Sequence, residues 1–547
     1  MNAFFISVAT ALAVLLSVRA AVEEDLVTSL PGFQGELPSK HYSGYISTGE
    51  LSGQKGQLHY WFIESQSDPS NDPGECALYS YSYFIKFTVY LYVIVVLWLN
   101  GGPGSSSLIG LLTENGQLHT NDQSLEQPID GVPQVFYNPY NWATTANMLY
   151  LESPKGVGFS YCEDVNSSSD CVNTDESTAQ DAYEFLVNFF KAYPEYASNK
   201  FFMTGESYAG IYIPMLMDQI DKNSLQAKIN LVGSAIGNGC WGNTVGTCDF
   251  SSPQAQQIRY GHTQIKYHLN HSYLYYHCFF FFPLFFLLFV CLFSADFFYG
   301  HGFYSQDLRK EIVTSCGDWS KLSPRCLKAL SKMEEEMGNF NTYNIYDECG
   351  KDQRRKLDSR KVTDAADGDD LEQYAGRVSK WRQIMSEKEL LVSTEQSMTH
   401  NAGYGEALND YACGGETAMS AWLDETSVID ALHVKANTPG MKYKKTATDL
   451  RPLYTDLINK YQILIYSGDT DGCVPYVGSE AWTAGLNFTV TNKWHQWVAK
   501  DDQTAGGNIH KAGYAITYDK FQFITINGAG HMVRSLYIRR LFLFIYF

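Results

Sequence analysis

The sequence predicts an α/β fold with a parallel central sheet, because three apolar stretches each run into a tight turn that carries a polar residue. They cover residues 202–210, 461–469 and 521–531. Each begins with the apolar run of a buried strand, and the first is followed by a stretch that favours a helix. Open α/β sheets bind ligands at the carboxyl ends of their strands. We therefore expect the polar residues of the three turns to meet in one site.

The first turn places Ser207 between small residues, with Gly205 two positions before it and Ala209 two positions after it. A turn that exposes a nucleophile is so sharp that only small residues fit at those two positions, and the serine oxygen then lies at a helix N-terminus that favours negative charge. The pattern is G-x-S-x-A, and a serine between small residues is more often an ordinary turn. Ser207 is therefore a candidate nucleophile that needs support from the rest of the chain.

Such a serine needs an acid and a base, which in this class of turn follow it in the order Ser, Asp, His. Asp469 ends the second apolar stretch and His531 ends the third, so we predict them as the orienting acid and the general base. Asp471 and Asp424 are alternative acids. His495 is an alternative base, although we expect it in a polar loop that does not follow a strand.

Four motifs in this order resemble the serine carboxypeptidase family: WLNGGPG at residues 98–104, GESYAG at 205–210, GDTD at 468–471 and GAGHMV at 528–533. The resemblance extends from about residue 30 to 533. It implies an α/β-hydrolase fold with an inserted, mostly helical cap domain. It also implies a serine-type carboxypeptidase that removes C-terminal amino acids from peptides and proteins at acidic pH, through a Ser-His-Asp triad and an acyl-enzyme, with no metal or cofactor.

The resemblance assigns further roles to residues near the predicted nucleophile. It implies an oxyanion hole formed by the backbone amides of Gly102 and Tyr208. It also implies a site for the free carboxylate of the substrate, formed by Asn100, Gly101, Glu114 and Glu206. Two glutamates beside a third carboxylate raise carboxyl pKa values and couple their titrations. We therefore expect the affinity for peptides to fall as the pH rises from acidic towards neutral.

Composition and termini predict a protein of the secretory pathway, lysosomal or secreted. The formal net charge is −19, which argues against nucleic acid and anionic membranes as partners. Residues 1–20 contain an apolar run that we interpret as a signal peptide, and Asn166 and Asn487 lie in glycosylation sequons. The expected partners are peptide or protein C-termini, and a homodimer is left open.

Twelve cysteines are typical of a disulfide-bonded protein in that compartment. Close spacing suggests three disulfides: Cys162–Cys171, Cys240–Cys248 and Cys316–Cys326. The resemblance implies that Ser105 stands where most members of the family have a cysteine that bonds to one near Cys349. Cys349 therefore needs another partner, and Cys413 is the nearest candidate. For Cys473, near the predicted acid, the resemblance implies a thiol outside any disulfide and close to the substrate.

The predicted organisation is a hydrolase core in two parts, residues 21–240 and 431–533, separated by a cap region at 241–430. Two aromatic-rich segments, 74–94 and 260–294, do not fit this fold, and we interpret both as introns read through in the gene model. We interpret residues 534–547 in the same way, as an aberrant C-terminus. The phenylalanine run in the second segment is shorter than about twenty residues and contains a proline, so we expect no membrane span.

Two other functions stay open on the sequence alone. Some relatives of this kind use the same triad as acyltransferases, passing the acyl group to an alcohol instead of water. Others have a non-catalytic, protective or scaffolding role for lysosomal glycosidases. The triad residues cannot distinguish these activities, but intact Asn100, Glu114 and Glu206 favour the peptidase.

Overall fold

The computed structural model describes residues 23–67, 94–163, 170–248, 295–316, 323–338, 340–346, 373–375, 416–436, 440–500 and 509–533. The predicted signal peptide, Asn166, Cys349, Cys413 and most of the two aromatic-rich segments lie outside these residues. Among the helices within them, none has both the length and the apolar content that crossing a bilayer requires.

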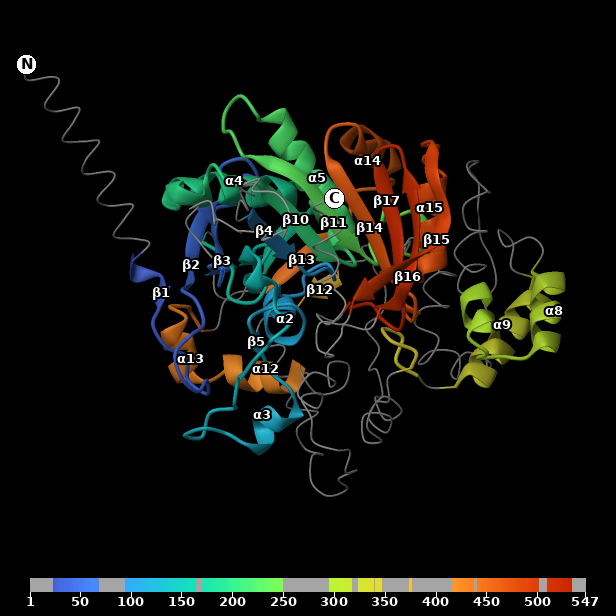
Figure 1. Ribbon diagram of the computed structural model, residues 1–547, viewed down its shortest axis with the longest axis horizontal. Helices are drawn as coiled ribbons and strands as arrows, with labels where there is room; N and C mark the ends of the chain where they lie inside the picture. Colours follow the sequence, from blue (N-terminus) through green and yellow to red (C-terminus); the bar gives the residue numbers. More distant parts are fainter. Residues whose placement is uncertain are drawn as a thin grey trace, which may run out of the picture.

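A large mixed sheet forms the centre of the molecule (Figure 1). Its central strands are all parallel: β7 (Ala146–Leu151), β4 (Ile94–Leu99), β10 (Phe201–Glu206), β11 (Leu231–Gly237), β14 (Gln462–Gly468) and β17 (Phe521–Ile526). Antiparallel strands extend it on both sides: β1 (Leu26–Val27), β2 (His41–Thr48), β3 (Gly56–Ile63) and β8 (Tyr161–Cys162) on one, β16 (Ile509–Tyr518) and β15 (Val490–Lys500) on the other. The parallel strands are mostly apolar and buried because both faces of the sheet are covered.

Helices cover the two faces of the sheet and create two core clusters (Figure 1). Alternate residues of β4 point to opposite faces, so Val95 and Leu97 enter one cluster while Val96 and Trp98 enter the other. The first cluster includes α4 (Asp175–Ala192), α5 (Ala209–Lys222) and α14 (Arg451–Ile458), and the second includes α2 (Leu108–Thr113), α12 (Glu416–Leu423) and α13 (Thr426–Ala431).

A third apolar cluster belongs to a helical pair inserted between β11 and the second part of the sheet. It contains α8 (Gln306–Ser315) and α9 (Pro324–Met337), which the Cys316–Cys326 disulfide joins. The chain then returns towards the sheet through residues 340–346.

The remaining short elements are β5 (Leu118–His119), α3 (Asp122–Glu126), β6 (Phe136–Tyr137), η1 (Trp142–Thr144), β9 (Cys171–Thr174), η2 (Pro194–Tyr196), η3 (Gly246–Cys248), β12 (Gln373–Ala375), β13 (Met441–Lys444) and α15 (Tyr476–Ala484).

This architecture confirms the predicted α/β class. The three apolar stretches identified in the sequence form β10, β14 and β17, and all three run parallel in one sheet. Their carboxyl ends therefore lie at the same edge, where the candidate site is found.

Candidate active site

Ser207 lies on the sharp turn between β10 and α5. Its backbone has a φ of +61°, a left-handed conformation that is costly for a residue with a side chain. A Cβ at Gly205 would lie 2.3 Å from the carbonyl oxygen of Leu99 and 2.8 Å from the Cβ of Ala209, so the turn has no room for a larger residue. Ser207 is partly exposed while its neighbours in the turn are buried. This geometry is that of a nucleophile elbow.

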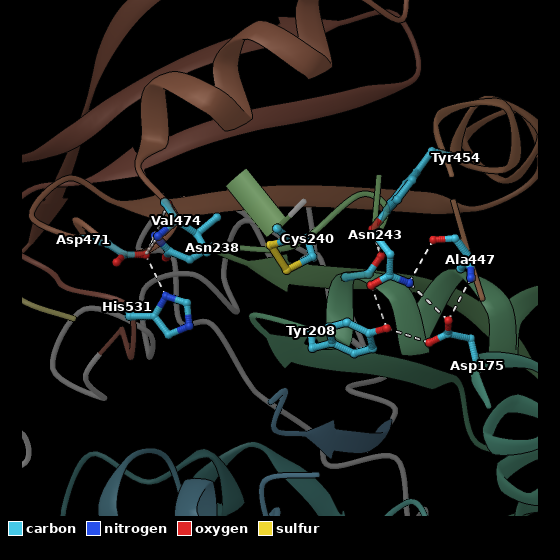
Figure 2. The surroundings of a disulfide bond; sticks show 12 residues. Asp175, Tyr208, Asn238, Cys240, Asn243, Ala447, Tyr454, Asp471, Val474 and His531 are labelled. Atoms are coloured by element: carbon cyan, nitrogen blue, oxygen red, sulfur yellow. Dashed lines mark hydrogen bonds and ion pairs between the residues drawn. A yellow bond between two sulfur atoms is a disulfide. The ribbon is translucent and has the colours of Figure 1, made fainter. Parts of the chain in front are cut away.

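His531 lies after β17 and hydrogen-bonds to Asp471, not to the predicted Asp469. The distance from His531 Nδ1 to Asp471 Oδ2 is 2.7 Å, and both side chains are buried (Figure 2). Asp469 instead accepts a 2.6 Å hydrogen bond from the backbone N–H of Gly528. The prediction of Asp469 as the orienting acid is therefore wrong. Asp469 directly follows the strand and closes the neighbouring turn, and the acid that reaches the histidine comes two residues later.

Asp471 is held by hydrogen bonds from several directions. Its Oδ1 accepts from the backbone N–H of Cys473 at 2.7 Å, and its Oδ2 accepts from the N–H of Val474 at 3.1 Å and from Asn238 Nδ2 at 2.8 Å (Figure 2). These donors stabilise a buried carboxylate and fix its direction.

Asn238 is a site residue that the sequence reasoning missed. It follows β11 and has a φ of +40°, and its Oδ1 accepts from the backbone N–H of Gly468 at 2.9 Å. Asn238 thus joins the ends of two strands to the acid. The Gly-Asn-Gly sequence at 237–239 is the signal that could have indicated it, because asparagine between glycines directly after a strand is typical of a left-handed turn.

The alternative acid and base lie elsewhere. His495 lies on β15, the edge strand of the sheet, so its predicted position in a loop is wrong. Its Nδ1 lies 2.8 Å from the carbonyl oxygen of Lys493. Asp424 directly follows α12, on the face of the sheet occupied by the second core cluster. The structure therefore favours His531 and Asp471, which bond each other, as the base and the acid.

The predicted carboxylate-binding residues form one buried cluster directly before the serine turn. Asn100 Nδ2 donates to Glu114 Oε1 at 2.9 Å and to Glu206 Oε1 at 3.0 Å. The indole N–H of Trp98 donates to Asn100 Oδ1 at 2.8 Å and fixes the orientation of the amide. Burial, and then the charge of Glu114 together with a hydrogen bond to it, raise the pKa of Glu206 well above its ordinary value. The cluster therefore retains a proton at higher pH than separate glutamates would.

The glycine loop after β4 packs directly against the serine turn. A Cβ at Gly101 would lie 2.3 Å from the backbone nitrogen of Tyr208 and 2.7 Å from the Cβ of Ser207. Gly102 has a φ of +107°, which side chains rarely tolerate. The two backbone segments predicted to form the oxyanion hole are therefore adjacent, and their role as donors stays a prediction.

Residues 340–346 bring part of the helical insertion to His531 and to the loop that carries Asp471. The backbone N–H of His531 donates to the carbonyl of Tyr343 at 2.7 Å, and the two rings lie 5.1 Å apart. The N–H of Gly472 donates to the carbonyl of Thr342 at 2.9 Å. Both loops that carry the acid and the base are thus attached to the insertion.

The cysteines agree with the predictions where the structure describes them. The disulfides Cys162–Cys171, Cys240–Cys248 and Cys316–Cys326 are confirmed. Cys473 is a half-buried thiol whose sulfur lies within 4.8 Å of ligand-type atoms of Asp471 and His531. Because those two side chains already bond each other at 2.7 Å, we interpret the three as part of a catalytic site and not as metal ligands.

Comparison with known proteins identifies the family. A family profile described as "Serine carboxypeptidase" matches residues 31–74, 92–269 and 289–540. The lysosomal protective protein of Mus musculus is 31% identical over 537 residues, covering 94% of this chain and 91% of that protein. Serine carboxypeptidase-like 20 of Arabidopsis thaliana is 30% identical over 556 residues, covering 95% and 92%. Serine carboxypeptidase 1 of Hordeum vulgare is 30% identical over 536 residues, covering 94% and 90%.

The profile leaves two stretches of the chain unmatched, between residues 74 and 92 and between 269 and 289. Both stretches lie in the two aromatic-rich segments. The match continues to residue 540, into the C-terminal stretch that we interpreted as aberrant. Intron read-through stays a prediction for all three segments.

A solved structure gives the fold. The crystal structure of Kex1(delta)p, a prohormone-processing carboxypeptidase from Saccharomyces cerevisiae, aligns with a TM-score of 0.59 over 96% of each chain at 16% identity. At that identity the likeness shows the fold alone, which is the predicted α/β-hydrolase fold with an inserted helical cap. Together with the match of the family profile over most of the sequence, it leads to one conclusion: the chain belongs to the serine carboxypeptidase family.

Proposed function

We propose that the protein is a carboxypeptidase that removes C-terminal amino acids from peptides at acidic pH. The observation that carries this proposal is the buried cluster of Asn100, Glu114 and Glu206, because Glu206 directly precedes Ser207. A group that binds the terminal carboxylate there places the last peptide bond of the substrate at the serine. An enzyme acting on esters or on internal peptide bonds has no use for such a cluster.

In the proposed reaction, Ser207 Oγ attacks the carbonyl carbon of the last peptide bond while His531 takes its proton. Asp471 holds the imidazole through Nδ1, so Nε2 is the ring nitrogen that takes the proton of the serine in this reaction. The backbone N–H groups of Gly102 and Tyr208 stabilise the oxyanion. His531 then gives the proton to the departing amine, and the acyl-enzyme is hydrolysed by water that His531 activates.

The pH dependence follows from the glutamate pair. When the pair holds a proton, it can donate a hydrogen bond to the substrate carboxylate, and when it loses that proton, it repels the carboxylate. The raised pKa of Glu206 moves the loss of the proton to higher pH than for an ordinary glutamate. The charge of Asp471 adds to this rise, whereas the hydrogen bond from Asn100 opposes it. KM for peptides should therefore be lowest at acidic pH and rise towards neutral pH.

A substrate comparison tests the proposed specificity. At pH 4.5 to 5.5, the full-length protein should hydrolyse a blocked dipeptide with a free carboxylate about 10- to 100-fold better, in kcat/KM, than the same dipeptide amide, since charge-assisted hydrogen bonds contribute about 1.5–3 kcal/mol. Release of the C-terminal residue would be followed by chromatography from pH 4 to 8. Equal rates for the two substrates would contradict carboxylate recognition, and transfer of the acyl group to an added alcohol in preference to water would support an acyltransferase.

Replacement of Glu206 by glutamine tests the physical reason for the pH dependence. Glutamine has about the same shape and stays neutral, so the rise of KM between pH 5 and 7.5 should shrink by about tenfold, the equivalent of one pKa unit. The matched control is Glu64→Gln, which changes another buried glutamate, one that accepts a 2.9 Å hydrogen bond from Tyr196. A pH profile of Glu206→Gln that superimposes on that of the unchanged protein would contradict the assignment.

We also propose that the protein works in the secretory pathway, in a lysosome or outside the cell. Three disulfides within the described residues support an oxidising compartment. An acidic compartment suits a site that binds its substrate best when a glutamate is protonated. Asn487 is exposed and follows α15, so it is accessible for glycosylation.

A further inference from the structure

Asp175 is a buried carboxylate close to the serine turn, and the reaction described above does not use it. It is the first residue of α4 and is 1% exposed. Its Oδ2 accepts from the backbone N–H groups of Thr446 at 2.5 Å and Ala447 at 2.8 Å, and from Asn243 Nδ2 at 3.2 Å (Figure 2). Burying an aspartate is costly unless several donors compensate, so this set of donors fixes the carboxylate in one orientation.

The other oxygen of Asp175 binds two tyrosine hydroxyls. Tyr208 and Tyr443 each place their hydroxyl 2.8 Å from Oδ1. The Tyr208 hydroxyl also lies 2.8 Å from Asn243 Oδ1, so its one proton is shared between two acceptor oxygens (Figure 2). Tyr208 directly follows the nucleophile, and its backbone N–H is one proposed donor to the oxyanion. A residue fixed at both its backbone and the end of its side chain cannot rotate that N–H away from the serine.

A second path leads from Asp175 to the glycine loop. Tyr443 and Tyr212 meet edge to face, with ring centroids 6.3 Å apart. The Tyr212 hydroxyl accepts from the backbone N–H of Gly104 at 3.1 Å. Gly104 belongs to the loop that contains Gly102, the other proposed donor to the oxyanion. The carboxylate thus connects through tyrosine side chains to both sides of the oxyanion hole.

We propose that Asp175 is a positioning residue that fixes the two backbone donors of the oxyanion hole through Tyr208 and through the Tyr443–Tyr212 pair. This inference rests on the proposed function in so far as that function requires an oxyanion hole. Donors must stand about 2.7–3.1 Å from the developing oxyanion before the reaction, and the loss of one donor costs about 10²–10³-fold in kcat. In this proposal Asp175 acts on the two donors only through the tyrosine side chains and does not contact the substrate.

The first test replaces Asp175 by asparagine. Asparagine is almost the same size but cannot accept from both the backbone amides and the tyrosine hydroxyls, so kcat for the blocked dipeptide should fall by about 10- to 100-fold, a part of the effect of losing a donor outright. KM should change less than threefold, roughly, because the carboxylate-binding cluster is separate. A peptide aldehyde, whose adduct with the serine carries the oxyanion, should lose affinity in parallel with kcat, whereas a product peptide should not.

The matched control is Asp181→Asn. Asp181 is also buried on α4, but it pairs with Lys155 at 2.7 Å and accepts from Ser52, not from the tyrosines. Its replacement should lower the temperature of unfolding without the loss in kcat that we expect for Asp175→Asn. If the two variants lost kcat and aldehyde affinity equally, Asp175 would be a structural residue only, and the proposal would fail.

Removal of single hydroxyls keeps the test decisive if Asp175→Asn folds poorly. Tyr443→Phe removes a hydroxyl that is remote from the serine, and we expect kcat to fall by about three- to tenfold, an effect similar to the loss of one neutral hydrogen bond. Tyr193→Phe is the control, because Tyr193 is equally buried and its hydroxyl bonds only to Tyr60 among the contacts shown by the structure, at 2.9 Å. An unchanged kcat in Tyr443→Phe would overturn the second path.

A reagent that needs no peptide separates this proposal from the proposed function. An organophosphorus fluoride reacts with an activated serine and places a phosphoryl oxygen in the oxyanion hole, so its labelling rate reports the hole directly. Asp175→Asn should slow labelling of Ser207 by about tenfold or more. If the unchanged protein were labelled but released no amino acid, the peptidase proposal would fail while Asp175 could still be tested. If labelling were equally fast in Asp175→Asn, the positioning proposal alone would fail.

Discussion

Replacement of Ser207 by alanine should lower kcat for release of the C-terminal amino acid by about 10⁵-fold or more, to the limit of detection. In the proposed reaction, the Oγ atom of Ser207 forms the covalent bond to the acyl group of the substrate. Without that atom, residual catalysis can come only from the oxyanion hole and from the binding of the substrate in the correct orientation. The measurement is amino acid release at pH 5 from a blocked dipeptide over several hours, together with the mass of the protein after reaction with an organophosphorus fluoride.

The control is Ser224→Ala, which changes an exposed serine shortly after α5. It should keep full activity and full labelling. Because Ser207 has a φ of +61°, alanine there keeps the same backbone strain, and we expect the temperature of unfolding to change little. Activity in Ser207→Ala above about one thousandth of the original would mean that another group is the nucleophile.

Replacement of Asp471 by asparagine should lower kcat by about 10⁴-fold. The amide of asparagine can donate to His531 Nδ1, which selects the tautomer whose Nε2 carries a proton and cannot act as a base. Asp469→Asn should lower kcat by less than about fivefold, since asparagine retains an oxygen that can accept from the N–H of Gly528. The pair of variants is a sharp comparison because the two aspartates are only two positions apart.

For both variants, kcat would be measured from pH 4 to 8 with one ester substrate and one peptide substrate. The reverse order, with Asp469→Asn the more damaged enzyme, would restore the assignment made from the sequence and contradict the hydrogen bond between His531 and Asp471. The temperature of unfolding must accompany the kinetics, because Asp471 accepts several buried hydrogen bonds and its loss is also a loss of stability.

The sequence predicts the turns of this site better than the side chains within them. The position of Ser207 follows from the small residues around it, because close packing against Leu99 and Ala209 excludes anything larger. The acid was placed wrongly because the end of a strand marks where a turn begins and not which of its side chains faces the neighbouring turn. Asp469 and Asp471 look alike in sequence, and only the direction of the loop distinguishes them.

Buried polar contacts between distant segments were beyond sequence reasoning. Asp175 looks like an ordinary acidic residue at the start of a helix, where a negative charge is expected. Its partners lie directly before α5, after β11, and on and after β13, and nothing in the local pattern indicates that they meet. The glutamate cluster became predictable only through the resemblance to a known family, since Glu114 by itself reads as the end of a short helix.

The hydrogen bond between the backbone of His531 and Tyr343 makes the position of the histidine depend on the insertion. The nucleophile, acid and base all belong to the two halves of the core, yet the backbone of the base is held by a carbonyl from the inserted segment. If the core were formed but the insertion were not docked, all three side chains would be present. The backbone N–H of His531 would then lack its hydrogen bond to Tyr343. A change in the insertion that breaks this contact would therefore free the backbone of His531 while leaving Ser207, Asp471 and His531 themselves unchanged.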